Sequence, residues 1–215
     1  MKFSKENMLL YAVTDQAWTQ EQSLYEQVEA ALKGGITCLQ LREKQLNDED
    51  FLKEALKIKK LCHAYHVPFF INDNVNVAIA CQADGIHVGQ EDMKACQVRE
   101  KVGKDMVIGV SVHNVKEAKE AVENGADCLG VGAVFSTSTK TDVDVLDRQV
   151  LCDICNVVDI PVVAIGGIHK HNILELSNTG VDGVALVSAI FAAKDIESEC
   201  RALKALSEEM VQSCK

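Results

Sequence analysis

Long apolar runs are missing from this sequence. No uninterrupted apolar stretch approaches the ~20 residues that cross a bilayer. The first residues, MKFSKENMLL, lack the apolar core and the small-residue cleavage site of a signal peptide. We therefore expect a cytoplasmic protein without a membrane-spanning segment.

The sequence also has few basic residues relative to acidic ones, and its cysteines do not suggest disulfides. Lys and Arg total 22 against 32 Asp and Glu, which gives a formal net charge of −10. This balance argues against nucleic acid or an anionic membrane as a partner, but it allows a small anionic substrate bound by a local group of basic side chains. The nine cysteines are an odd number, so we interpret them as buried or idle thiols and not as a disulfide framework.

The chain alternates between two hydrophobic patterns. Eight short runs rich in Val, Ile and Leu recur at even spacing, at residues 9–15, 36–42, 68–73, 85–89, 107–112, 128–135, 161–167 and 183–188. Amphipathic stretches with helical spacing lie between them; examples are residues 23–35, 50–66, 115–125 and 172–180. Near-continuous apolar strands with helices between them are typical of a parallel sheet covered on both faces.

Eight such units in 215 residues predict a compact (β/α)8 TIM barrel. A doubly wound open sheet is the alternative, but it rarely contains eight units so evenly spaced. The sequence has no linker, low-complexity tract or shift in composition. We expect one domain that spans residues 1–215.

In TIM barrels the active site is built at the carboxyl ends of the strands. Polar or glycine clusters follow seven of the predicted strands, at Gln40–Lys44, Asn72–Asp73, Gly89–Asp92, Ser111–His113, Ser136–Lys140, Gly166–Gly167 and Val187–Ser188. The sequence therefore gathers most of its polar motifs at one end of the predicted barrel.

Several of these clusters suit an anion. The glycine pair after the seventh predicted strand, and Ser188 after the eighth, would let backbone N–H groups approach a phosphate; the alternative is a plain tight turn. Arg42 and Lys44 are two residues apart and would bind a di-anionic group, unless they lie in a solvated loop with Glu43. The loop from Thr137 to Lys140 adds hydroxyls and an ammonium group.

Asp73 and Asp92 end adjacent predicted strands. Two carboxylates without a Cys or His cluster suit a hard cation such as Mg2+. They also suit general acid/base chemistry, or one or both could cap the helices that follow. His87 and His113 are further acid/base candidates, although a histidine inside an apolar strand such as His87 is more often a hydrogen-bonded core residue. Taken together, these clusters predict an enzyme that acts on phosphorylated small molecules with Mg2+.

The motifs themselves resemble a known family. They are QLREK (40–44), IND (71–73), GIHVGQED (85–92), GVSVH (109–113), TSTK (137–140), AIGGI (164–168) and ALVSAI (185–190), in this order along nearly the whole chain. Each is weak alone, but the set is similar to thiamine-phosphate synthase. This resemblance implies the coupling of 4-amino-2-methyl-5-(diphosphooxymethyl)pyrimidine to 4-methyl-5-(2-phosphooxyethyl)thiazole, with thiamine phosphate and pyrophosphate as products.

The resemblance also implies a role for each residue. Mg2+ would be bound by Asp73 and Asp92, and the catalytic residues would be Arg42, Lys44, Ser111 and Lys140. The pyrimidine pyrophosphate would be bound by Gln40, Leu41, Arg42, Glu43, Lys44, Asn72, Ser111 and Lys140. The thiazole phosphate would be bound by Thr137, Ser138, Thr139, Gly167, Val187 and Ser188. A homo-oligomer is compatible with the sequence, which does not define the oligomeric state.

The sequence departs from the family pattern after the sixth predicted strand. The family has a motif like GPVF with further prolines, whereas this chain has Gly132-Ala133-Val134-Phe135-Ser136, so we expect a looser loop there. The related thiazole tautomerase carries a His at the position of Ala133, and its absence favours the synthase. A tautomerase-like or non-catalytic paralogue that binds thiamine precursors, and another phosphate-binding barrel such as a sugar-phosphate epimerase, are the alternatives.

Overall fold

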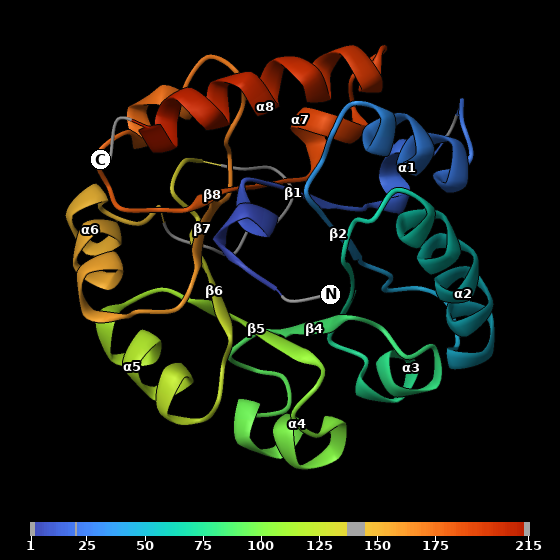
Figure 1. The fold of residues 1–215 in the computed structure, drawn as a ribbon, viewed down its shortest axis with the longest axis horizontal. Helices are drawn as coiled ribbons and strands as arrows, with labels where there is room; N and C mark the ends of the chain where they lie inside the picture. Colours follow the sequence, from blue (N-terminus) through green and yellow to red (C-terminus); the bar gives the residue numbers. More distant parts are fainter. Residues whose placement is uncertain (1–2, 20, 137–144, 213–215) are drawn as a thin grey trace.

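The computed structural model describes residues 3–19, 21–136 and 145–212. Its strands are all parallel, and each pairs with the next until β8 pairs with β1 and closes a barrel (Figure 1). The strands are β1 (Leu10–Val13), β2 (Cys38–Leu41), β3 (Phe69–Asn72), β4 (Gly85–Val88), β5 (Val107–Val112), β6 (Cys128–Val131), β7 (Val162–Ile165) and β8 (Gly183–Leu186). The predicted (β/α)8 barrel is confirmed, and each strand lies within its predicted run.

Helices form a ring outside the barrel (Figure 1). They are α1 (Leu24–Lys33), α2 (Asp48–Ala64), α3 (Val75–Ala80), α4 (Ala95–Val102), α5 (Val115–Glu123), α6 (Arg148–Val157), α7 (Ser188–Phe191) and α8 (Ile196–Gln212), with short 3-10 helices η1 (Lys5–Met8), η2 (Gln16–Trp18) and η3 (Ile173–Leu176). The start and end signals in the sequence work as expected in α1. Ser23 and Glu26 form a capping box there, and Gly34 is the C-cap.

The predicted helix over residues 172–180 is wrong. Only the single 3-10 turn η3 forms there, and Ser177 after it is extended, with a ψ of 143°. Arg148 of α6 donates hydrogen bonds to the carbonyl oxygens of Glu175 (3.2 Å) and Ser177 (2.5 Å). These bonds from a distant helix stabilise the non-helical backbone after η3.

An aspartate recurs at the amino-terminal end of the barrel. Asp84, Asp127 and Asp182 each precede a strand, and their carboxylates accept hydrogen bonds from the backbone N–H groups of Phe69 (2.9 Å), Ile108 (2.8 Å) and Val162 (2.9 Å). Each therefore satisfies a backbone donor at the start of the neighbouring strand. These aspartates, repeated in the sequence as QADG, GAD and GVDG, belong to the scaffold.

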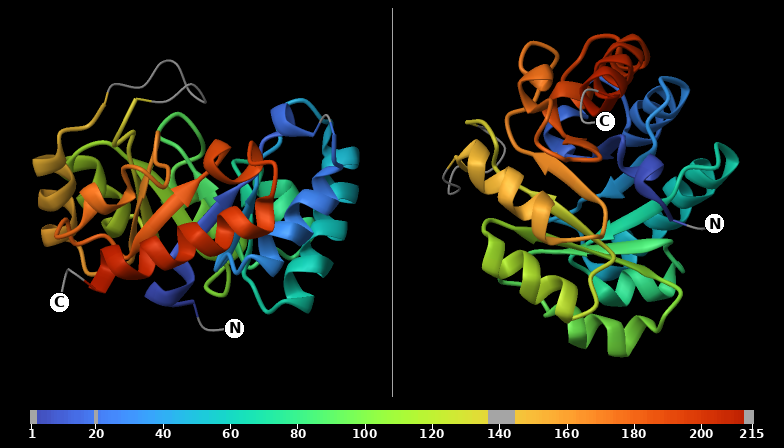
Figure 2. Two further views of the ribbon diagram at one scale, coloured as in Figure 1. Left: turned by 90° about the horizontal axis from the view of Figure 1, so that it is seen from above. Right: turned by 60° about the vertical axis from the view of Figure 1, so that its left-hand side comes forward.

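The N-terminal segment closes the same end of the barrel. Figure 2 (left) shows η1 below the strands, on the side opposite to η2 and α7. Met8 is fully buried, and the ring of Phe3 lies 5.5 Å from that of Phe70 inside the barrel. Full burial of a side chain such as Phe70 contributes about 1.5–3 kcal/mol to folding. The N-terminal segment therefore covers the barrel interior at this end.

The cysteines are free thiols, as expected, in the part of the chain that the structure describes. Eight of the nine are described and none is in a disulfide; Cys214 lies outside the described residues. Cys38 and Cys128 pack inside the barrel, where burial raises the pKa of both thiols well above the usual value. The described helices include none with the length and apolar character that a membrane span needs.

Candidate active site

A cavity of about 590 Å³ opens at the carboxyl ends of the strands. All eight strands or the loops after them line it. The residues are Tyr11, Val13, Gln40, Arg42, Lys44, Asn72, Asp73, His87, Gly89, Gln90, Glu91, Asp92, Ser111, His113, Gly130, Gly132, Ala133, Val163, Ile165, Gly166, Gly167, Ile168, Ala185, Leu186, Val187 and Ser188. The structure thus brings together ten of the sixteen residues to which the resemblance assigns a role: Gln40, Arg42, Lys44, Asn72, Asp73, Asp92, Ser111, Gly167, Val187 and Ser188.

The alternation of side chains along β2 decides which residues reach the cavity. Gln40 and then Arg42 point into the barrel, whereas Leu39 and Leu41 pack in the apolar layer between barrel and helices. Leu41 has no exposed surface and does not line the cavity. In this structure the side chain of Leu41, although part of the QLREK motif, packs in the core.

Glu43 also lies outside the lining of the cavity. Its carboxylate accepts hydrogen bonds from the backbone N–H groups of Lys44 (2.7 Å) and Gln45 (2.9 Å) and from the side chain of Gln16 (2.9 Å). Glu43 is therefore bound on the far side of the loop, and it fixes the turn from which Arg42 and Lys44 reach the cavity.

Arg42 is held in place from β1. Its guanidinium forms an ion pair with Asp15 at 3.2 Å, and both side chains are about 20% exposed. Its backbone N–H donates to the hydroxyl of Thr14, 2.9 Å away. Two contacts from one neighbouring loop restrict the orientation of the guanidinium before any ligand is present.

Two carboxylates meet at the ends of β3 and β4. Asp73 forms an ion pair with Lys44, and its carboxylate accepts a hydrogen bond from the side chain of Asn72 at 2.5 Å. Asp92 accepts from the backbone N–H of Gly89 at 2.8 Å. Burial raises the pKa of Asp92, and the hydrogen bond and charge of the nearby Asp73 raise it further, while the Gly89 N–H and Lys44 act in the opposite direction.

The hypothesis that these aspartates cap the following helices is wrong. Asn74 is the N-cap of α3 and accepts from the N–H of Val77 at 3.0 Å. The N-cap of α4 is Lys94. Asp73, which has a φ of +60°, is left with its carboxylate toward the cavity.

A divalent cation is compatible with this pair of carboxylates. Mg2+ commonly uses one or two carboxylates and completes its coordination with water and substrate phosphates. Among the residues the structure describes, no group of three or more His, Cys, Asp and Glu converges to form a complete protein cage. Asp73 lies close enough to raise the pKa of Asp92, and a bound cation would relieve the repulsion between the two carboxylates.

His87 and Ser111 form a hydrogen-bonded pair in the wall of the cavity. The imidazole Nε2 lies 2.9 Å from the hydroxyl of Ser111, and His87 is only 8% exposed. A Cβ added to Gly109 would lie 2.5 Å from the imidazole Nδ1, and one added to Gly130 would lie 3.2 Å from its Cε1. His87 is hydrogen-bonded, as expected for a core histidine, but it also lines the cavity, so its acid/base role stays a prediction.

Tyr11 was missed by the sequence interpretation. Its hydroxyl accepts a hydrogen bond from the side chain of Gln40 at 2.9 Å, and burial raises the pKa of the phenol well above its usual value. Tyr11 lies deep in an apolar strand, where it pairs with Cys38, and Gln40 lies two residues further along β2, so the contact depends on side chains that share the interior of the barrel and no sequence signal marks it. His113 lines the rim and forms an ion pair with Glu117 at 3.0 Å if the imidazole is protonated.

The glycine pair after β7 makes a close contact with the loop after β6. Gly166 and Gly167 have φ values of +100° and +65°, and a Cβ on Gly167 would lie 2.3 Å from the carbonyl oxygen of Ser136. The N–H groups of Val134 and Phe135 donate to the carbonyls of Ile165 (3.0 Å) and Gly166 (3.1 Å). Both glycines are therefore required by the turn itself, and an additional role in anion binding stays a prediction.

The remaining predicted site residues lie at the edge of the described chain or beyond it. Val187 is the N-cap of α7 and Ser188 its first residue, and both line the cavity beside the glycine pair. Thr137, Ser138, Thr139 and Lys140 lie outside the described residues. The loop that was expected to be looser begins within the described residues, where the N–H groups of Val134 and Phe135 are hydrogen-bonded, and its looseness stays a prediction.

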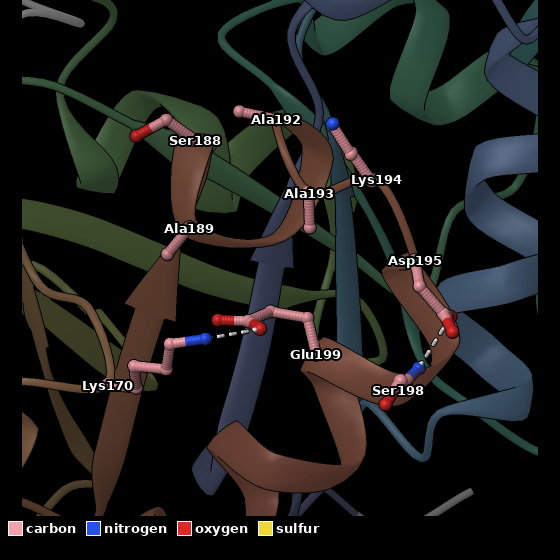
Figure 3. A pocket seen from close by; sticks show the side chains of 9 residues that line it. All are labelled: Lys170, Ser188, Ala189, Ala192, Ala193, Lys194, Asp195, Ser198 and Glu199. Carbon is pink, nitrogen blue, oxygen red and sulfur yellow. Dashed lines mark hydrogen bonds and ion pairs between the residues drawn. The ribbon is translucent and has the colours of Figure 1, made fainter.

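A second hollow of about 460 Å³ lies between α7 and the start of α8 and shares Ser188 with the first cavity (Figure 3). Small side chains, such as Ala189 and Ala193, line it together with Lys170 and Glu199, which form an ion pair at 3.0 Å. Asp195 accepts from the N–H of Ser198 at the start of α8 (3.0 Å). Lys194 also lines this hollow, which lacks the aspartate pair and the group of basic side chains that line the larger cavity.

Comparisons with known proteins agree with this geometry. The family model described as thiamine monophosphate synthase matches residues 10–190. Thiamine-phosphate synthase from Clostridium acetobutylicum is 47% identical over 90% of this chain and 92% of its own length, and that from Ruminiclostridium cellulolyticum is 47% identical over 93% and 95%. The structure of thiamine phosphate pyrophosphorylase from Pyrococcus furiosus is similar with a TM-score of 0.89 and 38% identity, and covers 96% of this chain and 98% of its own. The chain belongs to the thiamine monophosphate synthase family.

Proposed function

We propose that this protein joins 4-amino-2-methyl-5-(diphosphooxymethyl)pyrimidine to 4-methyl-5-(2-phosphooxyethyl)thiazole and releases thiamine phosphate and pyrophosphate. One observation carries the proposal: a single cavity has two anion-compatible regions on opposite walls. Arg42, Lys44 and the aspartate pair lie at β2–β4, whereas the glycine pair and α7 lie at β7 and β8, across the closed barrel. Two phosphorylated substrates would therefore meet between these walls.

The pyrimidine pyrophosphate would occupy the β2–β5 side. Gln40, fixed by Tyr11, offers an amide to the pyrimidine ring, and Asn72 lies beside it on β3. Arg42, Lys44 and Ser111, with Lys140 from the loop after β6, would bind the pyrophosphate. The phosphate of the thiazole would be bound by Gly167, Val187 and Ser188, with Thr137, Ser138 and Thr139 from that loop.

Mg2+ would be held by Asp73 and Asp92, whose oxygen-only donor set fits this ion. When bound, it would neutralise negative charge on the leaving pyrophosphate. The residues around it would supply the rest of the electrostatic stabilisation. Lys44 pairs with Asp73 and balances its charge.

The reaction needs no nucleophilic side chain. The C–O bond between the pyrimidinylmethyl carbon and the pyrophosphate breaks with its electron pair on oxygen, and the lone pair of the thiazole nitrogen forms the new C–N bond. Arg42, Lys44 and Lys140 stabilise the charge on the departing oxygens, and Ser111 donates a hydrogen bond to them. The two walls hold the nitrogen in line with the carbon, which removes much of the entropic cost of the encounter.

Two alternatives remain for the same cavity, a thiazole tautomerase and a non-catalytic protein that binds thiamine precursors. The relatives named above are synthases, and Ala133, at the mouth of the cavity, provides no acid or base. The free thiols of the described cysteines favour the cytoplasm as the site of action. A homo-oligomer built from single (β/α)8 domains of residues 1–215 is also part of the proposal.

Product analysis tests the proposed function. Purified protein is incubated with Mg2+ and both substrates, and with each substrate alone, and the products are identified by mass spectrometry. We expect thiamine phosphate only when both substrates are present. An isomerised thiazole in the absence of the pyrimidine would support the tautomerase instead, and tight binding of either substrate without any product would leave a binding protein.

A further inference from the structure

One amide side chain closes the loop that follows β7. The Nδ2 of Asn172 donates a hydrogen bond to the carbonyl oxygen of Gly167 at 2.9 Å, and its Oδ1 accepts from the N–H of His169 at 2.8 Å. The backbone adds a bond from the N–H of Asn172 to the carbonyl of His169 at 3.0 Å. Asn172 does not line the cavity, so it reaches the site only through this loop.

The bond to Gly167 fixes the orientation of one peptide group. In a trans peptide the C=O and the following N–H point in opposite directions within one plane. Since the carbonyl of Gly167 points to Asn172, the N–H of Ile168 points the other way, and Ile168 lines the cavity. Because Gly167 has no Cβ, rotation about its ψ could turn this peptide at low steric cost if nothing held it.

We propose that Asn172 is a positioning residue for the thiazole phosphate: by holding the carbonyl of Gly167, it keeps the Gly167–Ile168 peptide with its N–H toward the cavity. This deepens the proposed function and rests on it for the identity of the ligand. Backbone N–H groups bind a phosphate well only when they are oriented before it arrives, because reorientation upon binding costs affinity.

Two substitutions separate the role of the Asn172 side-chain N–H, which donates to Gly167, from that of its oxygen, which accepts from His169. Asn172→Asp is nearly isosteric and keeps the oxygen that accepts from His169, but loses the N–H that holds Gly167. Asn172→Ala removes both. Lys170→Ala is the matched control, because it removes the Lys170–Glu199 ion pair, which ties the same loop to α8 on the outer side, where an exposed pair contributes little.

The dissociation constant of the thiazole phosphate is measured by calorimetry without the second substrate, and the KM of each substrate is measured by turnover. For both Asn172 variants we expect a roughly tenfold weaker binding of the thiazole phosphate, as for the loss of one hydrogen bond. The KM of the pyrimidine substrate should stay within about twofold of the wild-type value, as should both constants in Lys170→Ala.

An unchanged dissociation constant in Asn172→Asp would overturn the inference, as would equal losses for both substrates, which indicate general loosening of the fold. Circular dichroism tests whether each variant is folded. If Asn172→Ala does not fold, the dissociation constant of Asn172→Asp alone tests the inference. If the wild-type protein binds the thiazole phosphate without turnover, the proposed function fails while calorimetry still tests Asn172. If it binds no thiazole phosphate, both fail.

Discussion

Asp92→Ala is expected to lower the rate of thiamine phosphate formation at saturating substrates by about 100-fold or more, which is the usual effect of removing one group that stabilises charge in the transition state. The carboxylate of Asp92 is part of the pair with Asp73 and is held toward the cavity by the N–H of Gly89. Without it, a single carboxylate already paired with Lys44 remains for the metal. The measurement is the rate as a function of Mg2+ concentration, and the curve should also shift to higher Mg2+.

The control for this variant is Asp159→Ala, which removes the same side chain from an exposed position before β7, at the opposite end of the barrel. Its rate and Mg2+ dependence should match those of the wild-type protein. A wild-type Mg2+ dependence in Asp92→Ala would contradict the assignment of Asp92 as a metal ligand.

The second large effect concerns stability as well as activity. Gly167→Ala is expected to lower the free energy of unfolding by about 3 kcal/mol, the sum of a left-handed φ for a residue with a Cβ and a clash in a packed loop. The added Cβ would lie 2.3 Å from the carbonyl oxygen of Ser136 and 2.8 Å from the carbonyl carbon of Phe135, and both are backbone atoms. Urea unfolding measures the loss, and the KM of the thiazole phosphate should rise in the variant that still folds.

Gly125→Ala separates the two contributions. Gly125 has a φ of +89°, but a Cβ there would meet only Arg99 at 3.7 Å, an ordinary contact. This variant should lose only about 1–2 kcal/mol. If the two variants lost equal stability, the close approach of the loops after β6 and β7 would not contribute to stability, contrary to this account.

The barrel could be predicted because its signals are local and repeated. Each strand is an apolar run, and the position of Asn74 after β3 or Gly34 after α1 marks a boundary with its own hydrogen bonds. The segment 172–180 shows the limit, because its pattern is helical but Arg148, distant in the sequence, donates hydrogen bonds to its non-helical backbone. Only the folded chain brings that side chain to the segment.

The residues at the rim of the site could be predicted from the sequence, but those in its interior could not. Polar residues at strand ends, such as Asp73 and Asp92, are visible in the sequence because they interrupt apolar runs. Tyr11 and His87 lie inside those runs, and their roles depend on partners in the next strands, Gln40 and Ser111. Leu41 shows the reverse: a family motif contains it, yet the alternation of β2 places it in the outer core.

The aspartates illustrate why position in the barrel decides a role. At the amino-terminal end, Asp84, Asp127 and Asp182 are bound to backbone N–H groups of neighbouring strands. At the carboxyl end, Asp73 and Asp92 lie next to each other in the lining of the cavity. The residue type is the same, but only the second group is placed where a ligand can reach it.

The most direct test of the central claim is the release of pyrophosphate, measured with both substrates, with each omitted in turn, and with EDTA in place of Mg2+. The account predicts release only when both substrates and Mg2+ are present. Release without the thiazole would mean that water, and not the second substrate, takes the pyrimidinylmethyl group. If EDTA left the release of pyrophosphate unchanged, Asp73 and Asp92 would not bind a metal that the reaction needs. No release at all would contradict the proposed reaction.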